Sequence, residues 1–501
     1  MIASHQEMPM PRLERASTLL AHALSVASVD RLRTGPFPTA QETAPSYSCV
    51  SSLLAEGQRI DAEIQRLHIL REEVNTQLRV ARSMLAPVRR LPTEILSEVF
   101  TLAVCSHPPH KRAFPARDVA AVCTIWRETA RATRNLWTCV DFTMATPASL
   151  EKLLNMHAEL SNGLLLHVYQ PPDVTASARL QHLLALPKEH TMRWGQICLH
   201  FEEAPRPPYA TPDLASLVRA DLVVSGDDAS QALHFLYHAR ALQSLFLHLA
   251  PNRIPSHIFM PSLPRLTKLC LVNHHLFSSE EYIIPILQGC AASLQRLVLS
   301  HRGKRNTTNS PAGGQPILFP ALLAVDLRYD APCILPHMDT PVLETIIIRD
   351  FARPSRPICA SLRHILKQSA PPIRNLKLHE VCGPAPGSED FISCLEHLDG
   401  LTTLIVSDSL DGRPMMTWVV LARMTCSDHR QPILPALTTL SLHHGRTDHR
   451  VPEKLERVLR VMLRSRSSRR VVHGCTVEAL QHVETDLKDD PIDLEGGSTD
   501  A

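Results

Sequence analysis

The chain of 501 residues has few aromatic residues, few glycines and almost no net charge. Phe, Tyr and Trp make up 4% of it, so its core must be built mainly from aliphatic side chains. The formal net charge is +2, which excludes an overall field that would draw the chain to nucleic acid or to a membrane. No run reaches about 18 apolar residues, and no signal-peptide layout is present. We therefore expect a soluble protein of the cytoplasm or the nucleus.

Paired cysteines and catalytic motifs are also missing. The 13 cysteines include no Cys-x-x-Cys pair, which removes the commonest zinc spacing, and their odd, scattered number fits a reducing compartment. Cys105, His107 and His110 form the tightest group of potential metal ligands, but side chains in such a Pro-rich loop are usually solvated. No Gly-x-Ser-x-Gly, phosphate-binding loop, Gly-x-Gly-x-x-Gly or His-Glu-x-x-His occurs. We expect no metal, no cofactor and no enzymatic activity.

The chain is long and rich in leucine and proline. A chain of 501 residues is too long for one ordinary hydrophobic core, so several domains or a solenoid are expected. The 40 prolines mark many connections, because proline is excluded from central strands and helix interiors. Residues 1–48 mix Pro, Ser, Thr and Ala without a sustained period, and we expect them to be disordered.

A long amphipathic helix is predicted over residues 49–86. Its apolar residues follow the alternating three-and-four spacing of a heptad seam, which Gly57 and Arg71 interrupt. Two interpretations remain open: a coiled coil that makes a homodimer through residues 53–85, or a helix that packs on its own downstream domain. The seam consists of Leu53, Ile60, Ile64, Leu67, Val74, Leu78, Ala81 and Leu85.

Residues 87–142 predict a small helical module. Pro87 ends the long helix, and Pro92 suits the first turn of the next one, where its missing N–H costs nothing. This helix is apolar over so wide an arc that a small domain cannot cover it, so we expect part of it to meet a partner. A second helix is predicted from about Asp118, followed by Leu136-Trp137 and a strand.

These blocks resemble the F-box. The matching segments are Leu-Pro-x-Glu-Ile-Leu-x-x-Val-Phe from Leu91, then Val-Ala-Ala-Val-Cys-x-x-Trp-Arg-x-x-Ala from Val119, then Leu136-Trp137, in that order. The resemblance implies that a Skp-type adaptor, and through it a cullin scaffold, docks on the first helix. The expected docking residues are Leu91, Pro92, Ile95, Leu96 and Val99. The expected module core is Val119, Val122, Cys123, Trp126, Leu136 and Trp137. The alternative is a generic helical pair with a buried tryptophan.

A Leu-x-x-Leu-x-Leu-like pattern recurs beyond residue 143. One such unit cannot bury its own apolar face, whereas stacked units build a continuous core beside a parallel sheet. The pattern occurs at Leu242-Leu245-Leu247, Leu266-Leu269-Leu271, Leu294-Leu297-Leu299, Leu322-Val325-Leu327, Leu343-Ile346-Ile348, Ile373-Leu376-Leu378, Leu401-Leu404-Val406 and Leu437-Leu440-Leu442, with Trp194-Ile197-Leu199 as an earlier member.

This pattern resembles a degenerate leucine-rich repeat, which implies an irregular solenoid over residues 143–475. The chain departs from the repeat consensus because the expected Asn or Cys after each strand is absent and the spacing drifts. The alternative is an ordinary α/β domain with parallel strands. Lys454–Arg470 predicts a helix that caps the last repeat, or alternatively a basic patch for nucleic acid. Residues 476–501 predict an acidic disordered tail.

The fold class expected is therefore α/β, with N-terminal helices followed by a leucine-rich-repeat solenoid. The functional hypothesis is a substrate-recognition subunit of an SCF-type cullin-RING ubiquitin ligase, which holds a target protein without performing chemistry itself. The alternative hypothesis is a non-catalytic interaction scaffold outside any ligase, dimeric through residues 53–85. Nucleic acid and membranes are not expected as partners.

Overall fold

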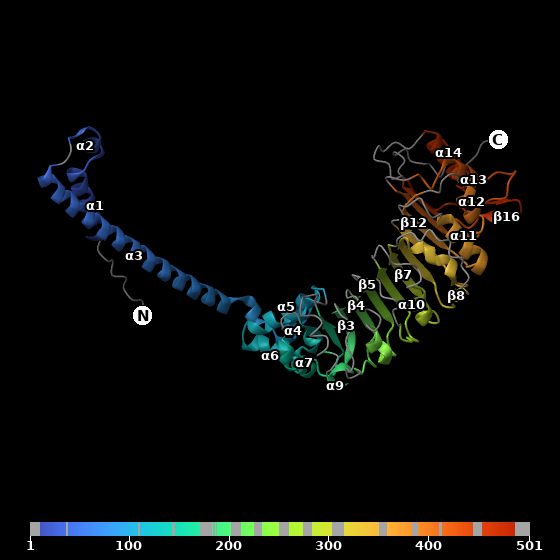
Figure 1. Cartoon of the computed structure of the whole chain (residues 1–501), viewed down its shortest axis with the longest axis horizontal. Helices are drawn as coiled ribbons and strands as arrows, with labels where there is room; N and C mark the ends of the chain where they lie inside the picture. The colour runs from blue at the N-terminus through green and yellow to red at the C-terminus, as the bar shows by residue number, and fades with distance from the viewer. Residues whose placement is uncertain are drawn as a thin grey trace. The chain divides into compact units, whose positions relative to one another are not determined.

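The structure is a computed structural model of mixed α/β type, with helices in the N-terminal part and a long parallel sheet beyond them (Figure 1). It divides into two compact units, Met1–Leu96 and Ser97–Ala501, which are described separately. The residues that the structure describes are 11–36, 39–108, 111–142, 146–170, 183, 186, 188–201, 212–224, 233–249, 260–273, 283–302, 315–349, 358–382, 389–409, 413–443 and 453–485.

The first unit is helical from Pro11 onward. Its elements are α1 (Pro11–Val26), α2 (Val29–Thr34), α3 (Ala40–Leu85) and the 3₁₀ turn η1 (Pro87–Arg90). The expectation of disorder over residues 1–48 is therefore wrong for residues 11–36 and 39–48, and residues 1–10, 37 and 38 lie outside the described part. Local chemistry supports these helices: the Ser28 side chain accepts a hydrogen bond from the Arg31 N–H and so caps α2.

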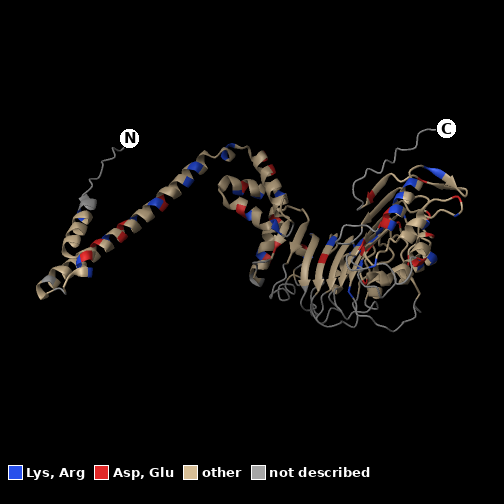
Figure 2. Cartoon of the chain, turned by 90° about the horizontal axis from the view of Figure 1, so that it is seen from above, with Lys and Arg blue, Asp and Glu red and all other residues tan. Residues whose placement is uncertain are grey.

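Helix α3 extends the predicted helix toward the N-terminus, beginning at Ala40 rather than at residue 49. Charges of both signs alternate along it (Figure 2), and Arg66 pairs with Glu63 one turn away at 2.9 Å. Its predicted seam is solvent-exposed in the structure from Ile60 onward, whereas Leu53 is partly buried. Exposure ranges from 42% at Ile60 to 72% at Leu85, with Ile64 and Leu67 in between.

The helical module of residues 87–142 contains one more break than the sequence predicted. Its elements are α4 (Thr93–Cys105), α5 (Ala113–Ala121), α6 (Thr124–Ala132) and η3 (Arg134–Trp137). A single second helix from Asp118 was expected, but Cys123 adopts an extended backbone conformation and separates α5 from α6. Because of this break, residues before and after Cys123 do not share one helix face.

In the part of the chain that the structure describes, thirteen strands form one sheet. Each strand pairs in parallel with the next strand of the sheet, and the order follows the sequence. The strands are β1 (Cys139–Asp141), β2 (Leu166–Tyr169), β3 (Trp194–Phe201), β4 (Arg219–Val224), β5 (Ser244–Leu249), β6 (Lys268–Asn273), β7 (Arg296–His301), β9 (Ala324–Tyr329), β11 (Thr345–Arg349), β12 (Asn375–Val381), β13 (Thr403–Asp408), β14 (Thr439–His443) and β17 (His482–Thr485).

Helices and short turns connect these strands on one side of the sheet, as Figure 1 shows for α10 to α13. Two small pairings accompany them: β8 (Ile317–Leu318) with β10 (Met338–Asp339), and β15 (Arg470–Val472) with β16 (Cys475–Val477). The connecting elements are α7 (Pro147–Leu160), α9 (Lys188–Thr191), η4 (His234–His238), α10 (Ile283–Cys290), η6 (Ala331–His337), α11 (Ile358–Ser369), α12 (Glu389–Leu395), α13 (Trp418–Met424) and α14 (Glu453–Ser465).

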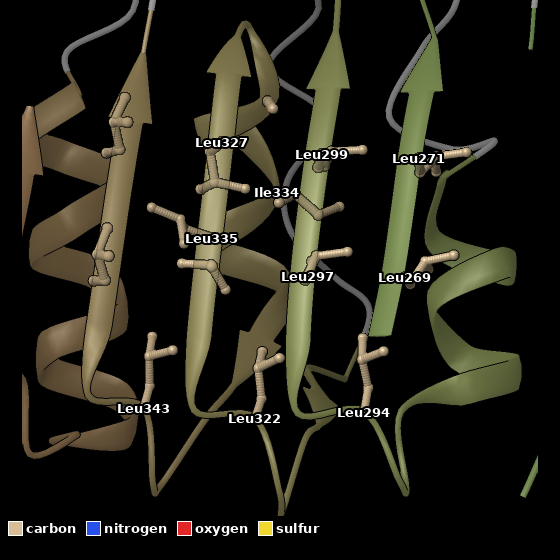
Figure 3. Close-up of a cluster of buried hydrophobic side chains, with 14 of the residues drawn as sticks. Leu269, Leu271, Leu294, Leu297, Leu299, Leu322, Leu327, Ile334, Leu335 and Leu343 are labelled. Carbon is tan, nitrogen blue, oxygen red and sulfur yellow. The ribbon is translucent and has the colours of Figure 1, made fainter. Parts of the chain in front are cut away.

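The leucine pattern sets the register of the sheet. Leu269 lies opposite Leu297, and Leu376 lies opposite Leu404, all at 0–1% exposure. Figure 3 shows the inward side chains of neighbouring strands stacked in rows, with Leu294 among those at the entry to each strand. The prediction of parallel strands with equivalent buried leucines is confirmed. Alternate strand residues bury their side chains because each row is covered by the equivalent row of the next strand.

The C-terminal end is ordered further than predicted. Helix α14 is shorter than the expected Lys454–Arg470 segment, and Arg466 beyond it is fully buried. Its guanidinium donates hydrogen bonds to the Met424 and Leu434 carbonyls at 2.9 and 3.0 Å, so it is a structural residue and not part of a basic patch. The predicted disordered tail from residue 476 is wrong as far as Thr485, because β17 pairs with β14; residues 486–501 lie outside the described part.

Candidate functional site

Helix α4 carries an exposed apolar stripe. The helix begins where the Pro92 carbonyl accepts a hydrogen bond from the Leu96 N–H at 3.0 Å. Glu94 lies in the first turn, where the positive end of the helix dipole stabilises a carboxylate. Exposure along the stripe is 37% at Leu91, 43% at Ile95 and 42% at Val99. Pro92 is exposed as well. Four of the five predicted docking residues are therefore accessible.

Leu96 is the exception among the predicted docking residues. It is only 2% exposed, and Phe100 and Val104, at four-residue intervals after it, are each 1% exposed. Residues four apart lie on the same face of a helix, so this second stripe of α4 points inward while the first points outward. The prediction that Leu96 docks a partner is wrong, because a side chain with so little accessible surface cannot contact one.

The outward stripe extends further than the five predicted residues. Leu102 continues the spacing and is 71% exposed. The next two helices also expose apolar side chains, Phe114 of α5 at 41% and Ile125 of α6 at 55%. The sequence spacing already predicts that Leu102 shares one stripe with Ile95 and Val99, although Leu102 was not among the expected docking residues. Phe114 precedes the predicted second helix and Ile125 lies inside it, so the sequence did not predict that either side chain is exposed.

The core of the module differs from the predicted set. Trp126 is half-buried, with its ring centroid 4.9 Å from that of Phe100 on α4. Val122 is 54% exposed, and Val119 and Cys123 are only partly covered. These four residues were expected in the core. The extended backbone at Cys123 turns their side chains to different sides, and this is why they do not pack as one face.

Leu136 and Trp137 were correctly predicted to be core residues. They are 1% and 4% exposed, and the Trp137 Nε1–H donates a hydrogen bond to the Ala130 carbonyl at 2.7 Å. This bond satisfies the only polar atom of the indole, which makes its burial favourable. Trp137 therefore ties η3 to the end of α6.

His157 joins the module to the sheet region. It lies on α7, is fully buried, and its Nδ1 is 2.8 Å from the Trp137 carbonyl, so Nδ1 carries the proton. Its ring also meets the Trp137 ring edge-on, with centroids 5.8 Å apart. Burial lowers the pKa of His157 to about 4, and the Trp137 carbonyl opposes that shift. The imidazole is therefore neutral at pH 7, and its hydrogen bond links α7 to Trp137.

Among the residues that the structure describes, no three His, Cys, Asp or Glu side chains come together as a metal site, and His110 lies outside them. The His107 Nδ1 donates to the Ala103 carbonyl at 3.0 Å. Burial raises the pKa of the Cys198 thiol to about 11 and that of Cys290 to about 12, so both are protonated at neutral pH and poorly nucleophilic.

The sheet presents a second accessible surface, its open face. On most strands the residues that alternate with the buried leucines are partly exposed, and the strand register aligns them in rows. Ser300 on β7 and Ser441 on β14 are buried exceptions. On β4 the charges on this face compensate each other: Arg219 pairs with Asp221 at 2.9 Å. None of the helices described is long and apolar enough to cross a membrane.

Comparison with known proteins adds no assignment. No protein-family model matches the chain, and no curated protein matches it.

Proposed function

We propose that this chain is the substrate-recognition subunit of an SCF-type cullin-RING ubiquitin ligase. In this role the helical module of residues 87–142 is an F-box that binds a Skp-type adaptor and, through it, the cullin scaffold. The parallel sheet region of residues 143–475 is a degenerate leucine-rich-repeat solenoid that holds a target protein. The chain itself performs no chemistry, and it raises the local concentration of the target beside the ubiquitin-charged enzyme.

The exposed stripe on α4 is the observation that carries the proposal. Ile95, Val99 and Leu102 leave between 42% and 71% of their surface in water, although the adjoining residues of the same helix are buried. Contiguous exposed apolar residues are costly to keep on a monomer and are typical of protein interaction sites. The order of the sequence blocks that resemble an F-box makes a Skp-type adaptor the partner of choice.

The solenoid part of the proposal rests on the strand order. Sequential parallel pairing, repeated from β1 to β14, means that each unit contacts mainly its neighbours, as in repeat proteins. Short helices such as α10, α11 and α12 close successive units on one side, as leucine-rich repeats do. The irregular unit lengths agree with a degenerate form of the repeat.

Co-purification with a Skp-type adaptor tests the proposal. The double variant Leu91→Ala/Pro92→Ala should weaken adaptor binding by about 2–4 kcal/mol, the loss typical of a central hot spot. The matched control is Leu318→Ala/Leu323→Ala, which also removes exposed apolar surface, 55% and 45% exposed, but in the sheet region. The control should bind the adaptor like the wild-type chain. Absence of adaptor binding by the wild-type chain at micromolar concentration would refute the ligase role.

The scaffold hypothesis remains the second candidate, because one observation favours it. The α3 seam is exposed at Ile60, Ile64, Leu67, Val74 and Leu78, each between 42% and 57%. A second copy of α3 would cover this seam, which makes the chain a dimeric interaction scaffold. Adaptor binding separates the two functions, since the scaffold role requires none.

A further inference from the structure

The open face of the sheet accumulates positive charge over five strands, β6, β7, β9, β11 and β12. Their register rows hold Lys268, Arg296, Arg328, Arg349 and Lys377, and the one carboxylate in these rows is Asp326. Glu380 stands outside the rows, in the bulge at the end of β12. The whole chain carries a net charge of only +2, so this accumulation does not follow from composition.

Like charges lie directly opposite each other within these rows. Arg328 on β9 is in register with Arg349 on β11, and Lys268 on β6 is in register with Arg296 on β7. Such pairs destabilise a sheet, because their side chains are separated by little more than the strand spacing of about 4.8 Å. The sequence places cations at these positions despite that cost, which indicates a role other than stability.

One carboxylate is shared by two guanidinium groups. The Asp326 Oδ1 lies 3.6 Å from the Arg328 Nε and 3.3 Å from the Arg349 Nε. These distances are ion pairs, and within the described residues none of the three atoms has a hydrogen-bond partner. The arginine side chains remain 42% and 39% exposed. Asp326 can neutralise one of the two arginines, so one positive charge remains for a ligand.

A histidine on β12 lies beside these cations. His379 on β12 is in register with Arg349, and its pKa is lowered first by burial and then by Arg349 and Lys377. Apolar side chains lie between the cations on the same face, with Val298 on β7 and Ile347 on β11. The surface therefore combines fixed cations with apolar contacts.

We propose that this face binds an extended acidic peptide segment, with Arg328 and Arg349 holding its carboxylates. Guanidinium forks match carboxylate oxygens in a two-point geometry, which strengthens and orients the contact. The five strands span about 19 Å, the length of about six extended residues. The inference rests on the proposed function in one respect: the peptide would belong to the target that the solenoid holds.

A peptide fits this surface better than single-stranded nucleic acid. Nucleic-acid surfaces combine cations with aromatic side chains on which bases stack. The open-face rows of the five strands contain no Phe, Tyr or Trp. Their aliphatic residues suit the side chains of a peptide instead.

Fluorescence anisotropy with the purified full-length chain tests the proposal. The probe is a labelled peptide of about 12 residues in which Glu and Asp alternate with Leu and Ser. Its reference is the same peptide with Gln and Asn in place of the acids. We expect the acidic peptide to bind at least about 10-fold more tightly at physiological salt. Equal affinity for the two peptides, or tighter binding of a single-stranded RNA of similar length, would overturn the proposal.

Three variants locate the site. Arg328→Gln/Arg349→Gln should weaken acidic-peptide binding roughly 10- to 100-fold. Arg219→Gln, on the same face but paired with Asp221, should change the affinity by less than about twofold. Asp326→Asn frees both arginines and should strengthen binding about threefold or more, an increase that misfolding cannot produce. Unchanged affinity in the double arginine variant would refute the site, whereas adaptor co-purification reports on the ligase role independently.

Discussion

The sheet region and helix α3 contain the same aliphatic residue types, but these side chains are buried in the sheet and exposed on α3. In the sheet, Leu297 and Leu404 are fully buried because an equivalent residue of the next strand covers each of them. In α3, Ile64 and Leu67 leave almost half of their surface in water. Burying such a side chain contributes about 1.5–3 kcal/mol, so the sheet gains from its own repetition what α3 can gain only from a partner.

The helical module shows the same contrast on a smaller scale. On α4, the face with Leu96 and Phe100 is buried, and the face with Ile95 and Val99 is exposed. One helix thus serves both the stability of the chain and an external surface. If this contrast holds throughout the chain, buried positions govern stability and exposed positions govern association.

The largest effect is expected at Trp137. Trp137→Ala removes a buried indole and its hydrogen bond to the Ala130 carbonyl, and should lower the free energy of unfolding by about 3–5 kcal/mol. Trp126→Ala, by contrast, should cost about 1–2 kcal/mol, because only the covered part of its ring contributes. Denaturant unfolding of the full chain measures both. Equal losses would mean that Trp126 is as deeply packed as the sequence first predicted.

A slightly smaller effect is expected inside the sheet. Leu297→Ala should lower the free energy of unfolding by about 2–5 kcal/mol, since the residue is 0% exposed and the cavity cannot collapse between two paired strands. Val298→Ala, on the open face of the same strand, should cost less than about 1 kcal/mol. If the two substitutions had the same effect, the assignment of the two sheet faces would be incorrect.

A pH-dependent effect is expected at His157. Its pKa is about 4 in the folded chain and about 6.5 when unfolded, so the unfolded state binds the proton first. Stability from this residue is therefore complete above about pH 6.5 and is lost as the pH falls toward 4, by about 3 kcal/mol in total. Unfolding curves from pH 7 to pH 4.5 measure the loss.

The matched variant for this measurement is His157→Asn, which keeps an N–H donor for the Trp137 carbonyl but does not titrate in this range. Other partly buried histidines, such as His167 and His248, also have lowered pKa values and contribute in the same direction. The difference between the wild-type and variant slopes therefore isolates His157. Parallel slopes would show that its imidazole is already charged, or accessible, in the folded chain.

The smallest effect on unfolding is expected from α3. Ile64→Asp/Leu67→Asp should change the free energy of unfolding of the sheet region by less than about 0.5 kcal/mol, because both side chains are exposed. The same variant should convert a dimer into a monomer in sedimentation, since charges would face each other across the seam. Gln58→Asp/Gln65→Asp, which lies outside the seam, should remain dimeric. A monomeric wild-type chain would rule out dimerisation through α3.

The leucine pattern of the sequence located nine of the thirteen strands and identified their inward residues, whereas β2, β4 and β17 contain no such unit and were not predicted. A two-residue alternation within each Leu-x-x-Leu-x-Leu unit specifies which side chains are buried, and repetition specifies the neighbour of each strand. The three- and four-residue spacing of a helix placed Ile95 and Val99 on the outward stripe of α4, but the expected docking set wrongly included the buried Leu96. The short helices of the first unit were not predicted from the sequence, because α1 packs against α3 and α2 depends on its local cap at Ser28.

Only the tertiary structure decided which apolar residues of the module are core. The extended backbone at Cys123 breaks the predicted helix, so that Val122 is exposed and Trp126 is half-buried. No neighbouring residue predicts this break from the sequence. The grouping of charged residues on the open face was likewise visible only in the tertiary structure. Arg328 and Arg349 are 21 residues apart in the sequence, and strand register alone makes them neighbours around Asp326. Periodicity determines which side a residue faces, whereas the contacts that it makes across strands follow from register, which only the folded chain supplies.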